Sequence, residues 1–81
     1  MTFAAIHPGE ILADELAEAR VTATCFARAI GVPPSRVMGI IHGRRGVTDD
    51  MALRLGKWFG SSAQFWLNLQ SAYERRIALD K

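Results

Sequence analysis

Apolar residues recur every three or four positions along almost the whole chain, and no stretch alternates strictly between apolar and polar residues. This spacing is typical of α-helices with one buried face, whereas strict alternation would indicate β-strands. The pattern predicts an all-α fold of five helices. The first is expected to begin at Pro8, because proline suits the first turn of a helix. Its expected buried residues are Ile11, Leu12, Leu16 and Ala19.

A second and a third helix are predicted on either side of a short turn. Thr22 can cap the second helix, and Gly31 can adopt the left-handed conformation that ends it. The pair Pro33–Pro34 cannot extend that helix, but its second proline suits the start of a third. An ordinary helical hairpin would share this periodicity, but the order of glycine, prolines and apolar residues favours a helix-turn-helix over about Ala23–His42. The expected buried residues are Phe26, Ala27, Ile30, Val37, Ile40 and Ile41.

Two further helices complete the predicted fold. Gly43 is expected to end the third helix, and Thr48 to cap a fourth that ends at Gly60. Ser61 or Ser62 then caps a C-terminal helix over about residues 62–79. The fourth helix is expected to bury Ala52, Leu55, Trp58 and Phe59. Because 81 residues leave no room for a second core, residues 1–81 are predicted to form a single domain.

The charged residues are unevenly distributed, although the formal net charge is only +2. Four of the eight acidic residues lie within residues 10–18, whereas residues 20–57 carry a net charge of +5. One acidic and one basic surface are therefore expected, although a mixed, solvated surface would have a similar sequence. The basic segment includes the predicted helix-turn-helix, which favours a polyanionic partner such as double-stranded DNA.

Other classes of function are disfavoured by the composition. One cysteine, Cys25, and two distant histidines, His7 and His42, cannot form a metal site, and no disulfide can form within the chain. No catalytic pair or nucleophile with its base can be assembled, so neither an enzyme nor a cofactor is expected. No signal peptide or apolar run of roughly 20 residues is present, so a cytoplasmic protein without membrane contact is expected.

The outward stripe of the third helix is the expected DNA-reading surface, because the second helix of a helix-turn-helix enters the major groove. Ser35 can bond a base or a phosphate, Met38 can contact a thymine methyl, and His42 can donate or accept a hydrogen bond. Arg44 and Arg45, just past this helix, are better placed for phosphates. The expected DNA contacts are Thr22, Thr24, Pro34, Ser35, Arg36, Met38, Gly39, His42, Arg44 and Arg45.

The C-terminal helix is a candidate dimerisation element, since so small a core favours further burial between two copies. Phe65 and Trp66 are adjacent and project about 100° apart, so one is expected to pack inward and the other to meet a partner. Core packing and a dimer contact remain alternatives for Trp66. The expected dimer contacts are Phe65, Trp66, Leu69 and Tyr73.

Four short motifs extend across most of the chain: His7–Leu12 (HPGEIL), Gly31–Val37 (GVPPSRV), Gly43–Thr48 (GRRGVT) and Phe65–Gln70 (FWLNLQ). Through them the stretch from His7 to Tyr73 resembles the HigA-type antitoxins, a branch of the Xre and lambda-repressor-like helix-turn-helix proteins. The resemblance implies a homodimer that binds a palindromic operator and represses its own operon. It also implies that the chain neutralises a small, basic, RelE-like toxin that cleaves mRNA.

The acidic first helix is the candidate toxin surface, because a basic ribonuclease would be steered towards it. The candidate residues are Glu10, Asp14 and Glu18, and a merely solvated acidic face is the alternative. A stand-alone Xre-type repressor without a toxin partner would have the same DNA-binding half. A structural helical adaptor would not need the basic middle segment.

The chain departs from the family pattern at two places. Ala23 stands where glutamine is common, which removes a side-chain contact to phosphate. Met38 and Gly39 stand where longer polar side chains are usual. Either the third helix approaches DNA closely at Gly39, or direct base reading is sparse and specificity depends on the rest of the stripe and on DNA shape.

Overall fold

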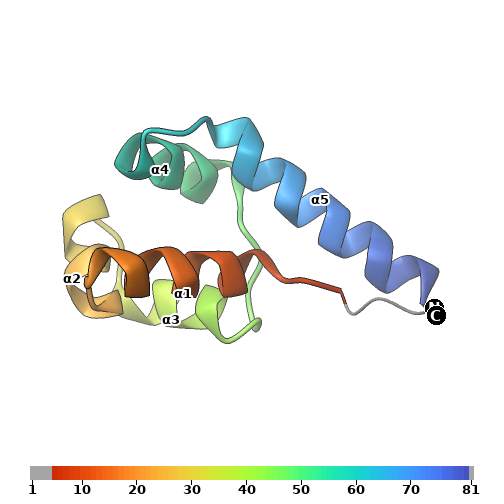
Figure 1. Cartoon of the computed structure of the whole chain (residues 1–81), viewed down its shortest axis with the longest axis horizontal. Helices are drawn as coiled ribbons and strands as arrows, with labels where there is room; N and C mark the ends of the chain where they lie inside the picture. The colour runs from red at the N-terminus through yellow and green to blue at the C-terminus, as the bar shows by residue number, and fades with distance from the viewer. Residues whose placement is uncertain (1–4, 81) are drawn as a thin grey trace.

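The computed structural model describes residues 5–80, which form five α-helices joined by short turns and contain no strand (Figure 1). The helices are α1 (Pro8–Ala19), α2 (Ala23–Ile30), α3 (Pro34–Ile41), α4 (Asp49–Phe59) and α5 (Ala63–Leu79). The predicted all-α, five-helix fold is therefore confirmed. Residues 1–4 and 81, which the predicted single domain includes, lie outside the described residues.

Most helix ends follow local signals in the sequence. Thr22, Thr48 and Ser62 precede α2, α4 and α5, and each side-chain oxygen accepts a hydrogen bond from the backbone N–H three residues later. Gly31 and Gly60 end α2 and α4 in the left-handed conformation, with φ of 74° and 70°. The side-chain caps, and Gly31, whose N–H donates to the Arg28 carbonyl at 3.3 Å, satisfy backbone groups that a helix end would otherwise leave without partners.

The start of α1 is fixed by His7. Its Nδ1 accepts a hydrogen bond from the Gly9 N–H at 2.9 Å, while the Glu10 carboxylate accepts one from the His7 N–H at 2.9 Å. This reciprocal pair is a capping box. The buried His7 ring also packs edge-on against Tyr73 of α5, with 4.7 Å between ring centroids. The beginning of α1 is thereby joined to α5.

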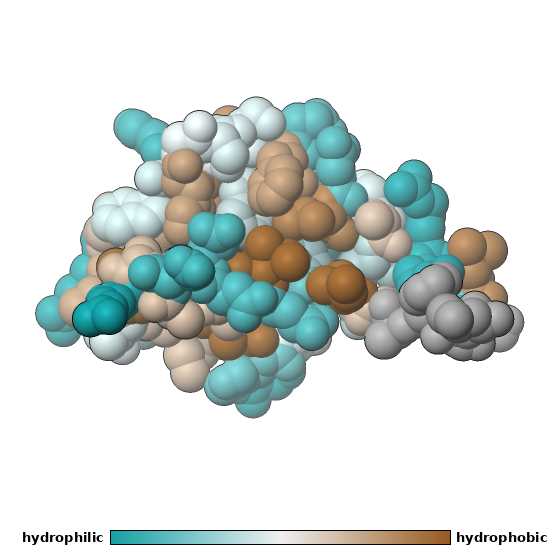
Figure 2. Space-filling model, viewed as in Figure 1, coloured by the Kyte–Doolittle hydropathy of each residue, from teal (hydrophilic) through white to brown (hydrophobic). Residues whose placement is uncertain are grey.

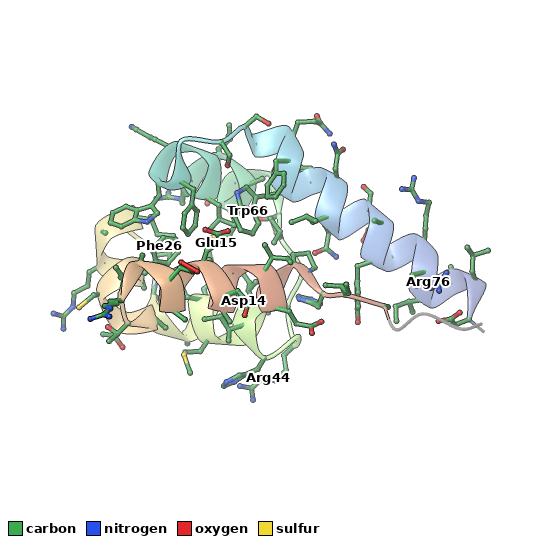
Figure 3. All side chains as sticks on the ribbon, in the orientation of Figure 1. Asp14, Glu15, Phe26, Arg44, Trp66 and Arg76 are labelled. Atoms are coloured by element: carbon green, nitrogen blue, oxygen red, sulfur yellow. The ribbon has the colours of Figure 1, made fainter. Side chains whose placement is uncertain are left out.

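A single apolar cluster lies between the helices, and Figure 3 shows Phe26 and Trp66 in the interior. Its buried members are Leu12, Leu16, Phe26, Ala27, Ile30, Val32, Val37, Ile40, Val47, Met51, Ala52, Leu55 and Trp66. Two predicted core residues are wrong. Ala19 is exposed because α1 ends there. Trp58 is 44% exposed, at the edge of the buried stripe of α4, and its ring packs edge-on against Phe26.

The C-terminal half of α5 projects beyond the other helices (Figure 1), and the described residues span 38 × 21 × 20 Å. The first half of α5 is held by α4 and by the loop before α4. In that loop, the Val47 N–H donates a 2.8 Å hydrogen bond to Oε1 of Gln70, and Gly46 lies against the same side chain. This contact joins residues 23 positions apart and fixes the loop that follows α3.

Candidate nucleic-acid interface

Helices α2 and α3 pack against each other across the three-residue turn 31–33. Phe26, Ala27 and Ile30 of α2 and Val37 and Ile40 of α3 are all buried at or near their junction. Within the turn, the Val32 N–H donates to the Ala27 carbonyl at 3.0 Å, and the Val32 side chain returns to the core. The turn is therefore short and tethered at both ends, and α3 has a fixed orientation on α2.

The outer stripe of α3 is exposed. It consists of Ser35, Met38 and His42, with Pro34 at its beginning. Met38 is 37% exposed, and Arg36 is half-buried on the flank. These residues lie at successive turns of one helix face, as an α-helix in the major groove requires.

The structure places Gly39 differently from the sequence-based expectation, which counted it among the DNA contacts. Gly39 is buried because the side chain of Arg45 lies over it. A Cβ atom placed on Gly39 would lie 3.0 Å from Cδ and 3.2 Å from Cγ of Arg45. The backbone of Gly39 is thus covered by a neighbouring arginine and is not open to DNA in this conformation.

The basic loop folds back onto the end of α3. The N–H groups of Arg44 and Arg45 both donate to the Gly39 carbonyl, at 2.8 and 3.1 Å. Nη2 of Arg44 lies 3.0 Å from Nδ1 of His42, and Figure 3 shows Arg44 beyond α3 at the lower edge of the view. Within residues 5–80, no ion pair engages either loop arginine or Arg36. This end of α3 is consequently a basic surface.

The start of α2 adds to the same basic character. The Thr22 hydroxyl is occupied as a cap, accepting from the Cys25 N–H at 3.1 Å, while Thr24 is exposed. The first turn of α2 contains no acidic residue, so the positive end of the helix dipole is uncompensated by its own side chains. Such a helix start attracts phosphate groups.

The predicted dimer residues are divided between core and surface. Trp66 is only 1% exposed and packs against Phe59 and Phe65, so its prediction as a dimer contact is wrong. Phe65 is 46% exposed, and Leu69 and Tyr73 are half-buried. Leu69 and Tyr73 line a hollow of about 370 Å³ between α5 and the chain around the start of α1. Figure 2 shows hydrophobic surface along this side of the molecule.

The acidic residues of α1 are all exposed, as an interaction surface would require. Figure 3 shows Asp14 and Glu15 along α1. Glu10 also forms part of the capping box of α1, so its carboxylate has a structural role.

In the part of the chain that the structure describes, no three acidic, histidine or cysteine side chains are grouped to hold a metal ion. No helix there is long and apolar enough to cross a membrane.

Known proteins similar to this chain share its whole helical core, although no protein-family model matches it. Virulence-associated protein I of Dichelobacter nodosus is 49% identical over 75 residues, which are 91% of this chain and 69% of that protein. An addiction-module antidote protein of the HigA family from Coxiella burnetii superposes with a TM-score of 0.93 at 47% identity, covering 96% of this chain and 86% of that one. The antitoxin HigA of Pseudomonas aeruginosa, solved with the higBA promoter, superposes with a TM-score of 0.90 at 49% identity, covering 93% of this chain and 83% of that one. At these identities and coverages, the chain belongs to the HigA family of helix-turn-helix antitoxins.

Proposed function

We propose that this chain is a cytoplasmic, DNA-binding antitoxin that binds a palindromic operator as a homodimer, represses its own operon and neutralises a RelE-like mRNA-cleaving toxin. The observation that carries the DNA-binding part is the exposed stripe of α3 beside arginines that no carboxylate pairs with among residues 5–80. The P. aeruginosa HigA bound to its promoter supports the same assignment. Phosphate contacts from the arginines would position α3, and its stripe would read bases.

Replacing Arg44 with alanine is expected to weaken binding to the DNA upstream of the chain's own gene and to make binding less dependent on salt. Each phosphate contact contributes about 0.9 to the slope of log affinity against log salt concentration. Two copies of Arg44 in a dimer would therefore change the slope by about 1.8. Fluorescence anisotropy between 50 and 200 mM salt, with a labelled duplex of about 30 base pairs, measures the slope.

The matched control for this variant is Arg75→Ala, which removes the same charge from an exposed position on α5. Arg75 lies outside the proposed DNA surface, so its loss is expected to leave the slope unchanged. An Arg44→Ala slope equal to that of the unaltered protein would contradict a phosphate contact at Arg44.

The proposed dimer surface is one face of α5. Phe65, Leu69, Ala72 and Tyr73 fall within about 100° of one another around the helix axis. This stripe continues beyond the bundle, where Ile77 is 39% exposed on the projecting half of α5. Covering such apolar side chains with a second copy removes them from water and stabilises a dimer. If the α3 helices of the two copies, the proposed recognition helices, then lie about 34 Å apart, their spacing matches one turn of DNA.

The proposed toxin surface is the exposed acidic side of α1. Reversing Asp14 and Glu18 together to lysine is expected to weaken toxin binding at least about tenfold, because like charges repel a basic partner at an interface. Glu10 is left in place because its carboxylate caps α1. The measurement is co-purification and titration with the product of the neighbouring reading frame, together with mRNA cleavage in a translation reaction.

The control for the charge reversal is Glu74→Lys on α5, an exposed acidic position away from α1. It is expected to leave toxin binding unchanged. Unaltered neutralisation by the double α1 variant would show that the acidic side of α1 is only solvated. A neighbouring reading frame that encodes no small basic ribonuclease would favour the stand-alone repressor.

A further inference from the structure

The middle of α3 contains a slot that is filled from outside the helix. Gly39 is the one residue of α3 without a side chain, and a glycine inside a helix lowers its stability relative to alanine. The space beside it is occupied by Cγ, Cδ and Nε of Arg45, all within 3.5 Å of where a Cβ would be. Gly39 therefore admits the arginine side chain against the helix backbone.

The same residue also anchors Arg45 through its main chain. The Gly39 carbonyl accepts hydrogen bonds from the N–H groups of Arg44 and Arg45. Backbone and side chain are thus both held at one point on α3, which restricts where the guanidinium can lie. Arg45 and Arg36 line one hollow of about 430 Å³ on the flank of α3, together with Thr48 and Met51.

The guanidinium of Arg45 has unused hydrogen-bonding capacity. Across residues 5–80, no carboxylate or carbonyl accepts a bond from it, and the same is true of Arg36. Arg44 differs, because its Nη2 already contacts Nδ1 of His42, at a distance of 3.0 Å. A planar fork of donors whose stem lies along α3, the expected recognition helix, suits the O6 and N7 acceptors of guanine in the major groove.

We propose that Arg45 is a base-reading, specificity-determining residue, held on the recognition helix by the slot at Gly39, and that it recognises a guanine in each operator half-site. The inference rests on the proposed DNA-binding function and changes the role expected for Arg45 from the sequence, which was a phosphate contact. The long polar side chain that α3 lacks at its midpoint is supplied by the following loop. Gly39 acts as a positioning residue for it.

The test is a selection of binding sites from a pool of randomised 24-base-pair duplexes, carried out with the unaltered protein and with three variants. Arg45→Ala is expected to lose the preference for one guanine per half-site, by about 5- to 100-fold, while the other positions keep theirs. Gly39→Ala keeps the charge of Arg45 but fills the slot, and is expected to lose the same preference. Arg44→Ala is the matched control, expected to weaken binding while the guanine preference stays intact.

Thermal unfolding separates loss of the slot from misfolding. Arg45 is flexible and can move aside, so Gly39→Ala is expected to raise the unfolding midpoint by about 4 °C through its better helix propensity. Specificity then falls while stability rises, which a damaged fold cannot produce. The double variant Gly39→Ala/Arg45→Ala is expected to lose no more specificity than either single variant, because both remove one interaction.

Three results would overturn the inference: a uniform loss of affinity in Arg45→Ala with every base preference intact, an unchanged guanine preference in Gly39→Ala, or additive losses in the double variant. If the unaltered protein enriches no sequence from the pool, the proposed DNA-binding function itself fails. Enrichment by the unaltered protein, with preferences unchanged in both Arg45 and Gly39 variants, rejects only the role of Arg45.

Discussion

Gly9→Ala is expected to destabilise the protein by about 3 kcal/mol, because a Cβ atom at this position would overlap the backbone of α3. It would overlap the Ile40 carbonyl oxygen and lie 2.6 Å from the Ile40 carbonyl carbon and 3.0 Å from Cα of Ile41. Backbone atoms cannot rotate away as a side chain can, so α1 and α3 would have to separate. Thermal or urea unfolding followed by circular dichroism measures the loss, with an expected fall in midpoint of more than about 10 °C.

Gly43→Ala is the control for this prediction. Gly43 has a φ of 74°, and no atom lies within 4 Å of where its Cβ would be. The same substitution there introduces only left-handed backbone strain, of about 1 kcal/mol. An equal loss of stability in the two variants would show that α1 does not approach α3 as closely as the structure indicates.

The close approach at Gly9 shows what could not be predicted from the sequence. The end of α2 at Gly31 and the start of α4 after Thr48 depend on caps formed by residues within a few positions, so both were predicted correctly. The need for a glycine at residue 9 comes from Ile40, about thirty positions away. Only the packed structure shows which helices approach closely enough to exclude a side chain.

The two wrong core assignments have the same origin. Periodicity alone places Trp58 three residues after the buried Leu55, and therefore near the inner face of α4. Trp58 nevertheless lies at the edge of the buried stripe, where α2 covers only part of its ring. Ala19 has the right helical phase but lies at the last residue of α1, where no neighbour covers it. The width and length of a buried face are set by its neighbours.

The candidate interface was predicted from the sequence in outline but not in its detail. The outward stripe with Ser35, Met38 and His42 follows directly from helical phase, and the structure exposes all three. The covering of Gly39 by Arg45 depends on how the loop after α3 folds back. Nothing in the sequence around Gly39 and Arg45 indicates that the two residues will be in contact. The same loop is fastened by Gln70, whose contact with Val47 carried no recognisable sequence signal.

The C-terminal helix shows why the position of one aromatic ring changes the functional interpretation. Trp66 and Phe65 are neighbours, but α5 turns Trp66 into the core and leaves Phe65 46% exposed. Trp66 is thus part of the scaffold that orients α4 and α5, while Phe65 starts the proposed dimer stripe. Stability and dimerisation should therefore respond to different residues of the same helical turn.

Trp66→Ala is expected to reduce the free energy of unfolding by about 3–5 kcal/mol, because it removes a fully buried ring and leaves a cavity beside Phe59. A domain of this size has a total stability of about 5–10 kcal/mol, so much of the protein should unfold at moderate temperature. Trp66→Phe keeps an aromatic ring in the core, and the indole N–H that it removes has no partner among residues 5–80. This variant is therefore expected to lose less free energy of unfolding than Trp66→Ala. Urea unfolding at several protein concentrations measures both variants.

The adjacent variant Phe65→Ala is the control, and it is expected to behave in the opposite way. It should reduce the stability of the monomer by only about 1 kcal/mol, because the Phe65 ring is 46% exposed and loses mainly its edge-on contact with Trp66. It should instead raise the dissociation constant of the dimer, which sedimentation equilibrium measures, and make the unfolding midpoint less dependent on protein concentration, because a smaller fraction of the protein is dimeric. If Trp66→Ala shifted the dimer equilibrium while leaving monomer stability intact, Trp66 would be an interface residue. The core role of Trp66 and the dimer role of Phe65 would then both be wrong.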